Sequence, residues 1–245
     1  MTKLHRSFVT TSHLGGEETV GRRYLAVLIA ILLLSIAACG GGGGGGPVAR
    51  TALQLEKFAA VANGADEFRN IWGRSPSATE LDKALAAAGR APEMGFHVPV
   101  ATQARSAAES FLEQYRTSSA DVVTLVGHND GGTFRFADGS PLSFSELSFA
   151  GGPPVALISC NSMTYANGQA VGVPSAITFT VAYATEAKFA ARLTSRTSVP
   201  TVPELQSMLV ESLEEAAAES GVQMKYVVFG VGTVGGGIAV WQQVA

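Results

Sequence analysis

His128 and Cys160 are the residues whose chemistry and placement best suit catalysis, because each stands at the end of a short apolar run typical of a buried strand. The two runs cover 122–126 and 154–159. Sites in open α/β sheets lie outside the carboxyl ends of the strands, so two parallel neighbours would deliver both side chains to one edge. A thiolate is a nucleophile, and a nearby imidazole lowers the pKa of a thiol and later gives a proton to the leaving group. The pair therefore favours nucleophilic catalysis.

A plainer interpretation stays open for both residues, namely a buried Cys at a strand end and a turn His that share no chemistry. Free Cys is commonly just a small core residue. Asp130 and Asp138 are candidates to orient His128, but an Asp in an Asn-Asp-Gly-Gly segment is typical of a turn. Asp130 is kept as a supporting residue. His97 is predicted to lie in a loop near the helices and outside any site.

The elements that must position this pair follow two patterns. Residues 48–120 are predicted to be helical, with one helix over about 52–68, one from the capping box at Ser77 to Gly89, and one whose apolar stripe covers 104–115. After residue 120, apolar strands are predicted at 122–126, 154–159, 176–182, 226–229 and 238–241. Helices are predicted at 186–193 and from the capping box at Thr201. Near-continuous apolar strands alternating with helices indicate an α/β fold with a buried, mostly parallel sheet and an N-terminal helical segment.

Composition excludes several classes of protein. The 245 residues include 17 Lys and Arg against 20 Asp and Glu, a formal charge of -3, and only 15% of residues are charged. That balance excludes a disordered charged polymer and a basic nucleic-acid binder. The 2 Cys exclude a disulfide-rich scaffold and a four-cysteine zinc site. The G-x-G-x-x-G at 230–235 has no room for the helix and acidic residue of a dinucleotide site, so no cofactor and no metal are predicted.

The first forty residues are predicted to be a targeting segment. Arg22 and Arg23 precede an apolar run at 24–34 and small residues before Cys39, the order of a secretory signal. The segment 36–39, Ile-Ala-Ala-Cys, resembles the lipobox of bacterial lipoproteins. That resemblance implies cleavage after residue 38 and lipidation of Cys39; an uncleaved signal anchor is the alternative. Residues 39–47, the lipidated Cys and a run of glycines, would form a flexible tether to the body at 48–245, which divides into the helical part 48–120 and the α/β core 121–245.

The stretch from 122 to 163 resembles the caspase-like cysteine peptidases, including the CHAT and gingipain-like branches. It reads VVTLVGHNDGG, then FRFADGSPLSFSEL, then PVALISCNSM. The resemblance implies a three-layer sandwich, a helix at 143–149, His128 as general acid/base and Cys160 as nucleophile. It also implies that the N–H groups of Cys160 and Asn129 hold the oxyanion. Asn129 stands where the family has Gly, and Asn is one of the few residues that tolerate left-handed conformations.

Three functions are open at this point. The first is a membrane-anchored cysteine endopeptidase that acts on a peptide or protein substrate through a Cys-His dyad. The second is a catalytically inactive caspase-like lipoprotein that binds a partner in the cell envelope, and the third is an envelope protein with a chance likeness to the family. The partners expected are the lipid bilayer, through acylated Cys39, and a peptide or protein, with no nucleic acid. The expected location is the bacterial cell envelope, at an outer membrane facing the periplasm or the surface.

Overall fold

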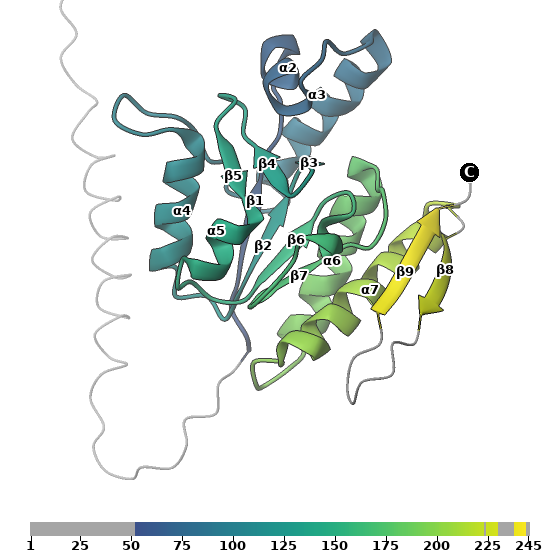
Figure 1. Cartoon of the computed structure of the whole chain (residues 1–245). Coiled ribbons are helices and arrows are strands. Elements are labelled where there is room, and N and C mark those ends of the chain that lie inside the picture. The colour runs from purple at the N-terminus through teal and green to yellow at the C-terminus, as the bar shows by residue number, and fades with distance from the viewer. Residues whose placement is uncertain (1–51, 223, 230–237, 244–245) are drawn as a thin grey trace, which may run out of the picture. The chain divides into compact units, whose positions relative to one another are not determined.

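The centre of the structure is a four-stranded, all-parallel sheet in the order β1-β2-β6-β7 (Figure 1). The computed structural model of the protein describes residues 52–222, 224–229 and 238–243. The strands are β1 (Leu55–Ala59), β2 (Val122–Val126), β6 (Val155–Ile158) and β7 (Ala170–Gly172). Every residue of β2 and β6 is buried, which explains why these two strands are almost continuously apolar.

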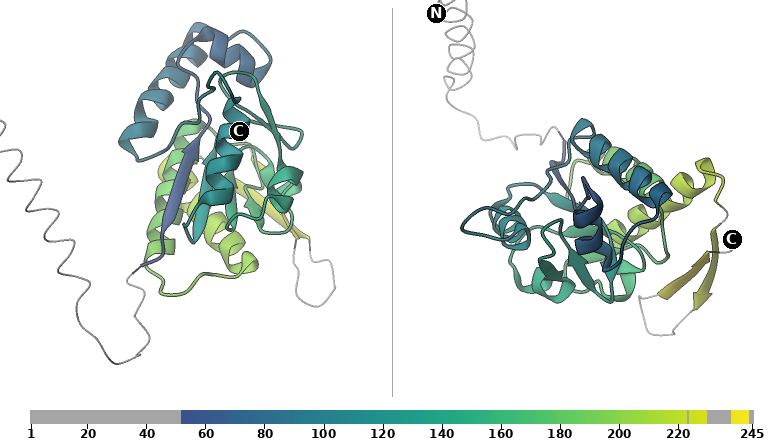
Figure 2. Two further views of the ribbon diagram at one scale, coloured as in Figure 1. Left: turned by 90° about the vertical axis from the view of Figure 1, so that its left-hand side faces the viewer. Right: turned by 90° about the horizontal axis from the view of Figure 1, so that it is seen from above.

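Helices cover both faces of this sheet (Figure 1, Figure 2). On one face lie α4 (Ala107–Thr117) and α5 (Phe144–Phe149). On the other face lie α3 (Ala78–Glu93), α6 (Phe179–Thr194) and α7 (Val202–Glu219). Because side chains alternate between the faces along each strand, each face of the sheet has an apolar core of its own. The predicted α/β fold with a parallel sheet in a three-layer sandwich is confirmed.

Capping boxes open four of the described helices. At α3 the Glu80 carboxylate accepts the Ser77 N–H at 2.9 Å, while Ser77 Oγ accepts the Glu80 N–H at 3.3 Å. The boxes predicted at Ser77 and Thr201 are confirmed, and two further boxes are centred on Ser106 and Ser143. The predicted end of α3 at Gly89 is wrong, because the helix continues to Glu93 with Pro92 in its last turn.

The predicted helix over 52–68 is also wrong. The segment forms β1, which pairs in parallel with β2, and then α2 (Ala65–Trp72). Its alanines and charged residues suit a helix locally, but Phe58 and Ala59 are completely buried on opposite faces of the sheet. Tertiary burial has overridden local propensity here. The part of the chain predicted to be only helical therefore supplies an edge strand of the central sheet.

The predicted strand over 176–182 is wrong for a similar reason. Those residues are a loop and the first turn of α6, where Thr178 Oγ1 accepts the Val181 N–H at 3.3 Å and caps the helix. Val181 and Ala182 are buried on the inner side of this helix, and a short apolar run of this kind cannot be distinguished from a strand by its pattern alone. The sheet's outer strand on this side is β7, which is too short to stand out in the sequence.

Two smaller antiparallel sheets complete the described fold. One contains β3 (Asn129–Asp130), β4 (Thr133–Arg135) and β5 (Pro141–Ser143), and the other contains β8 (Met224–Phe229) and β9 (Ile238–Gln243). The last two predicted strands therefore exist but pair with each other and not with the parallel sheet. The glycine segment 230–235, the signal segment 1–38, Cys39 and the tether 39–47 lie outside the described residues. Among the described helices, none is long and apolar enough to span a bilayer.

One carboxylate, that of Glu186 on α6, is buried against the face of the sheet that α3, α6 and α7 cover. Glu186 is 0% exposed, and its Oε2 lies 3.5 Å from Nζ of Lys57 on β1. Its Oε1 has no hydrogen-bond partner among the described residues. Lys57 Nζ also lies 5.1 Å from the centre of the Phe96 ring. Burial raises the pKa of Glu186 to about 7, and the nearby Lys57 charge only partly opposes that shift.

Glu186 should therefore make the folded protein less stable as the pH rises. Because its pKa is about 7 when folded and near the ordinary 4.5 of a Glu side chain when unfolded, between these pH values the folded state retains a proton that the unfolded chain has released. The free energy of unfolding should fall across that window by on the order of 1–3 kcal/mol from this group. Urea unfolding of Glu186→Gln at a series of pH values should lack that fall. Glu93→Gln, at an exposed site, should retain it, and an unchanged slope in Glu186→Gln would contradict the assignment.

Candidate active site

The register of β2 and β6 brings His128 and Cys160 to one edge of the sheet. Val126 pairs with Ile158 in parallel. His128 comes two positions after Val126, and Cys160 comes two positions after Ile158. Alternation along the strands returns both to the same face. Both side chains line one cleft of about 600 Å³. The prediction that the two strands are parallel neighbours is confirmed.

Three segments build the walls of this cleft around the two residues. The first is α2 with the turn after it, which follows the carboxyl end of β1 and contributes Phe68, Trp72 and Arg74. The second is one side of α3, and the third is the chain from Ile177 into the first turns of α6. Figure 1 shows α2 and α3 side by side beyond the end of the sheet near β3 and β4. The cleft thus lies at the edge of the sheet where sites in open α/β folds are found.

Trp72 is the central contact of the aromatic wall. Its ring stacks on Phe68 with 4.2 Å between centroids and an interplanar angle of 17°. The same ring lies 5.5 Å from the His128 ring and 5.7 Å from that of Phe179. These contacts hold the imidazole between the carboxyl end of β2 and α2. They also make one side of the cleft a surface of exposed ring edges and faces.

Burial lowers the pKa of His128, and the positive charge of Arg74 lowers it further, whereas Asp130 opposes the shift. The imidazole is therefore mainly neutral at pH 7. A neutral imidazole can accept a proton from a thiol, which a protonated one cannot. Asp130 influences His128 through its charge, and its side chain is exposed to solvent.

The Cys160 thiol is partly exposed and free, and its hydrogen bonds go to the backbone of Ile177. Its Sγ accepts the Ile177 N–H at 3.4 Å and donates to the Ile177 carbonyl oxygen at 3.5 Å. Both residues of the pair are described, and no hydrogen bond joins the thiol to His128.

Asn129 acts through its side chain. Its Nδ2 donates to the Cys160 carbonyl oxygen at 2.7 Å, and its Oδ1 accepts the Gly132 N–H at 2.9 Å. The left-handed conformation considered for Asn129 is not adopted, because among the described non-glycine residues only Asn161 has a positive φ. Gly131 and Gly132 take the positive φ values that the β3–β4 turn needs, so Asn129 remains in strand β3.

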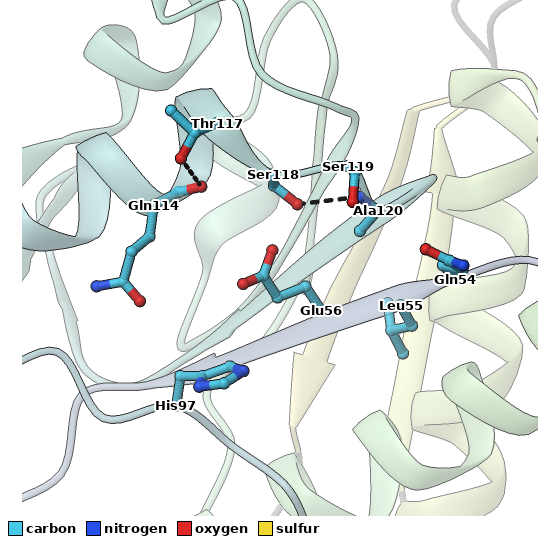
Figure 3. Close-up of a pocket in the computed structure, with 9 residues that line it drawn as sticks. All are labelled: Gln54, Leu55, Glu56, His97, Gln114, Thr117, Ser118, Ser119 and Ala120. Atoms are coloured by element: carbon cyan, nitrogen blue, oxygen red, sulfur yellow. Dashed lines mark hydrogen bonds between the residues drawn. The ribbon is translucent and has the colours of Figure 1, made fainter. Parts of the chain in front are cut away.

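The other acid–base candidates lie elsewhere. Asp138 accepts the Ala107 N–H at 2.9 Å and the Ser140 N–H at 3.0 Å, so it caps α4 and does not orient His128. His97 bonds through its backbone to the outer edge of β1, where its N–H donates to Lys57 O at 2.8 Å. It borders a separate polar pocket of about 400 Å³ at the amino-terminal end of β1, together with Glu56 and Gln114 (Figure 3).

Several residues of the cleft were not singled out from the sequence, among them Trp72, Arg74, Ile177 and Phe179. Ile177 and Phe179 lie in the segment that was predicted to be a strand, whereas Trp72 and Arg74 lie just beyond the helix predicted over 52–68. For Trp72 the signal in the sequence is the Gly73 that follows it, because a glycine commonly ends a helix. Gly73 does end α2, in the left-handed conformation with φ 68°. For Ile177 the contact to Cys160 is made by the backbone, so its side chain carries no signal.

Comparison of the chain with models of known protein families and with curated protein sequences finds no match. The chemistry available to the site thus comes from the groups that it brings together: a free thiol, a neutral imidazole and a partly aromatic cleft. Within the described ranges, no group of three or more His, Cys, Asp or Glu side chains could hold a metal ion. The likeness to caspase-like peptidases stays a prediction.

The amide of Asn129 should contribute measurably to stability. Asn129→Ala removes two hydrogen bonds at a residue that is 8% exposed and leaves the buried Gly132 N–H without its partner. We expect the free energy of unfolding in urea to fall by about 1–3 kcal/mol. The neighbouring Asp130→Ala, at an exposed side chain, should change it by less than about 0.5 kcal/mol. Equal effects of the two substitutions would contradict the structural role of the amide.

Proposed function

We propose that the protein is a caspase-like cysteine peptidase that uses a dyad of Cys160 and His128. One observation carries the proposal: β2 and β6 pair in parallel with Val126 opposite Ile158, and the thiol and the imidazole that follow them line the same cleft. Parallel neighbours in this register place the residues that follow them at the same end of the sheet, where a thiol and an imidazole can act on one bound group. The aromatic wall around His128 further supports a site that excludes water from a reacting group.

The groups present suffice for acyl transfer. His128 accepts the Cys160 proton, and the thiolate attacks the scissile carbonyl carbon to form a tetrahedral oxyanion. The N–H groups of Cys160 and Asn129 are the donors proposed for that oxyanion. When the C–N bond breaks, His128 gives its proton to the leaving amine and the acyl group remains on sulfur as a thioester. Water then attacks the thioester and gives a proton to His128, the C–S bond breaks to release the carboxylic acid, and His128 returns the proton to the Cys160 thiolate.

In the unliganded protein the thiol proton points to the Ile177 carbonyl. Before the first step the S–H must turn from this acceptor toward His128, while the Ile177 N–H continues to face the sulfur. Catalytic hydrogen bonds are often long or misaligned without substrate and form only in the reacting complex. The proposed dyad is therefore completed when a peptide fills the cleft.

A second function, a caspase-like module that binds a peptide without cleaving it, is favoured by one observation. The thiol is bonded to Ile177 and has no hydrogen bond to His128, although both residues are described. In that case Cys160 would act as a structural contact between the end of β6 and the loop before α6. The two functions differ in whether His128 activates the thiol.

Reaction with an electrophilic peptide probe distinguishes these functions. A peptidyl acyloxymethyl ketone should label the wild-type chain, and Cys160→Ala should abolish the label, which assigns it to one of the 2 Cys residues. His128→Ala should slow labelling by about 10²-fold or more, because the base that activates the thiol is lost. Alkylation by iodoacetamide in urea should be the same in wild type and His128→Ala and serves as the control. Equal labelling of these two folded proteins would exclude an activated thiolate.

We further propose that acylated Cys39 anchors the chain in a bacterial envelope membrane. The supports are the paired arginines, the apolar run at 24–34 and the small residues before Cys39. More than one acyl chain is needed, because a single chain binds a membrane only reversibly. The glycine run after Cys39 would then provide a flexible connection to the body.

Metabolic labelling with palmitate tests the anchor. Expression in a bacterium that processes lipoproteins should give a labelled protein in the membrane fraction. Cys39→Ser should lose the label and the membrane association, because the residue that accepts the lipid is missing. Cys160→Ser, a matched substitution of the other Cys, should retain both. Label that persists in Cys39→Ser would contradict the proposed anchor.

A further inference from the structure

The cleft that holds His128 and Cys160 has two chemically different walls. One wall is aromatic and is built by Trp72 and Phe179, whose ring centroids are 5.7 Å apart at an interplanar angle of 69°. Both rings are partly exposed, whereas Phe58, Phe111 and Phe189 in the two cores are completely buried. Because Trp72 also lies 5.5 Å from His128, an apolar group bound against this wall would lie beside the reacting atoms.

The other wall is cationic. Lys83 and Arg90 line the cleft from α3, and both are exposed. Neither has an ion-pair partner among the described residues, whereas the basic residues Lys188, Arg192 and Arg196 all do. Seven residues separate them, which is about two helical turns or 10 Å along one side of the helix. Their charges are therefore available to a ligand in the cleft.

A third cation lies between the two walls. Arg74 is held by Glu80, with Nη1 3.1 Å from Oε2, and its guanidinium lies 5.6 Å from the centre of the Phe68 ring. Glu80 is the only carboxylate among the residues that line the cleft, so three cationic side chains face one anion. The chain as a whole has a net charge of -3. The positive charge is thus concentrated where the apolar wall is also open.

We propose that this cleft selects peptides that carry a large aromatic or aliphatic side chain beside the scissile bond and a Glu or Asp side chain a few residues away. The apolar side chain would pack against Trp72 and Phe179, and the carboxylate would meet Lys83 and Arg90. Burial of an apolar ring supplies most of the affinity, and the exposed charge pairs add specificity. The inference rests on the proposed peptidase function for cleavage, although selective binding is measurable without turnover.

Binding to the full chain carrying Cys160→Ala tests the selection directly. Fluorescence anisotropy compares four short labelled peptides that differ at two positions: Phe with Glu, Phe with Gln, Phe with Lys, and Ala with Glu. The Phe–Glu peptide should bind most tightly, and its affinity should fall as salt is added, because exposed charge pairs are screened. Phe–Lys should bind most weakly of the three peptides that contain Phe.

Substitutions of exposed residues identify the wall of the cleft that recognises the charge of the peptide. Lys83→Gln with Arg90→Gln should weaken binding of the Phe–Glu peptide by about 3–10-fold and leave the Phe–Gln peptide unchanged. Arg116→Gln, an exposed cation on α4 at the opposite face of the sheet, should change neither. Trp72→Leu should weaken all peptides that contain Phe. Equal affinity for the Phe–Glu and Phe–Lys peptides, or no effect of the double variant, would overturn the inference.

Cleavage by the wild-type chain separates this inference from the proposed function. If wild type cleaves all four peptides without regard to the Glu, the peptidase proposal holds and the selection is wrong. If the Cys160→Ala chain binds the Phe–Glu peptide selectively and wild type cleaves none of them, the selection holds and the peptidase proposal is wrong.

Discussion

The parallel pairing of β2 and β6 determines where every group of the cleft lies. Both strands are fully buried, and their side chains fill two separate cores, so a shift of one residue would move each apolar side chain to the wrong face. The register is therefore strongly specified by burial alone. His128 and Cys160 each come two positions after one member of the pair formed by Val126 and Ile158. The packing of the core, which sets this register, therefore also sets where the two side chains lie.

Many of the residues around the thiol and the imidazole come from one long connection of the chain, which also contributes Ala87, Ala88 and Ala91 to the core. The segment between β1 and α4 leaves the sheet, forms α2 and α3, and returns along the outer edge of β1. It contributes Trp72 beside the imidazole and the cations of α3. A sandwich with a shorter connection would retain the thiol, the imidazole and Phe179 at the edge of the sheet but would lack Trp72 and the cations of α3. The parallel sheet thus positions the reactive groups, and the segment between β1 and α4 forms much of the cleft through which a ligand would reach them.

Local signals in the sequence were sufficient for β2, β6 and the capping boxes, and from the strands they also predicted the edge on which the site lies. They failed where a long-range contact decides the structure. The sequence of β1, with its Glu56 and Lys57, suits a helix locally, and only the burial of Phe58 and Ala59 in two different cores makes it a strand. β7 is three residues long and has no pattern of its own. Trp72 meets both His128 and Phe179 only because α2 and α6 fold onto one edge, and no spacing in the sequence encodes that approach.

The amide of Asn129 connects the end of β6 to the small β3–β4–β5 sheet. It holds the Cys160 carbonyl on one side and, through the Gly132 N–H, the β3–β4 turn on the other. Phe134 and Leu142 of that small sheet belong to the core beneath α4 and α5. A displacement of the backbone at Cys160 would therefore be transmitted across the sandwich to the far layer. The Asn129 side chain, together with the contact between the Tyr165 and Phe144 rings, thus joins the backbone near the thiol to the layer that contains α5.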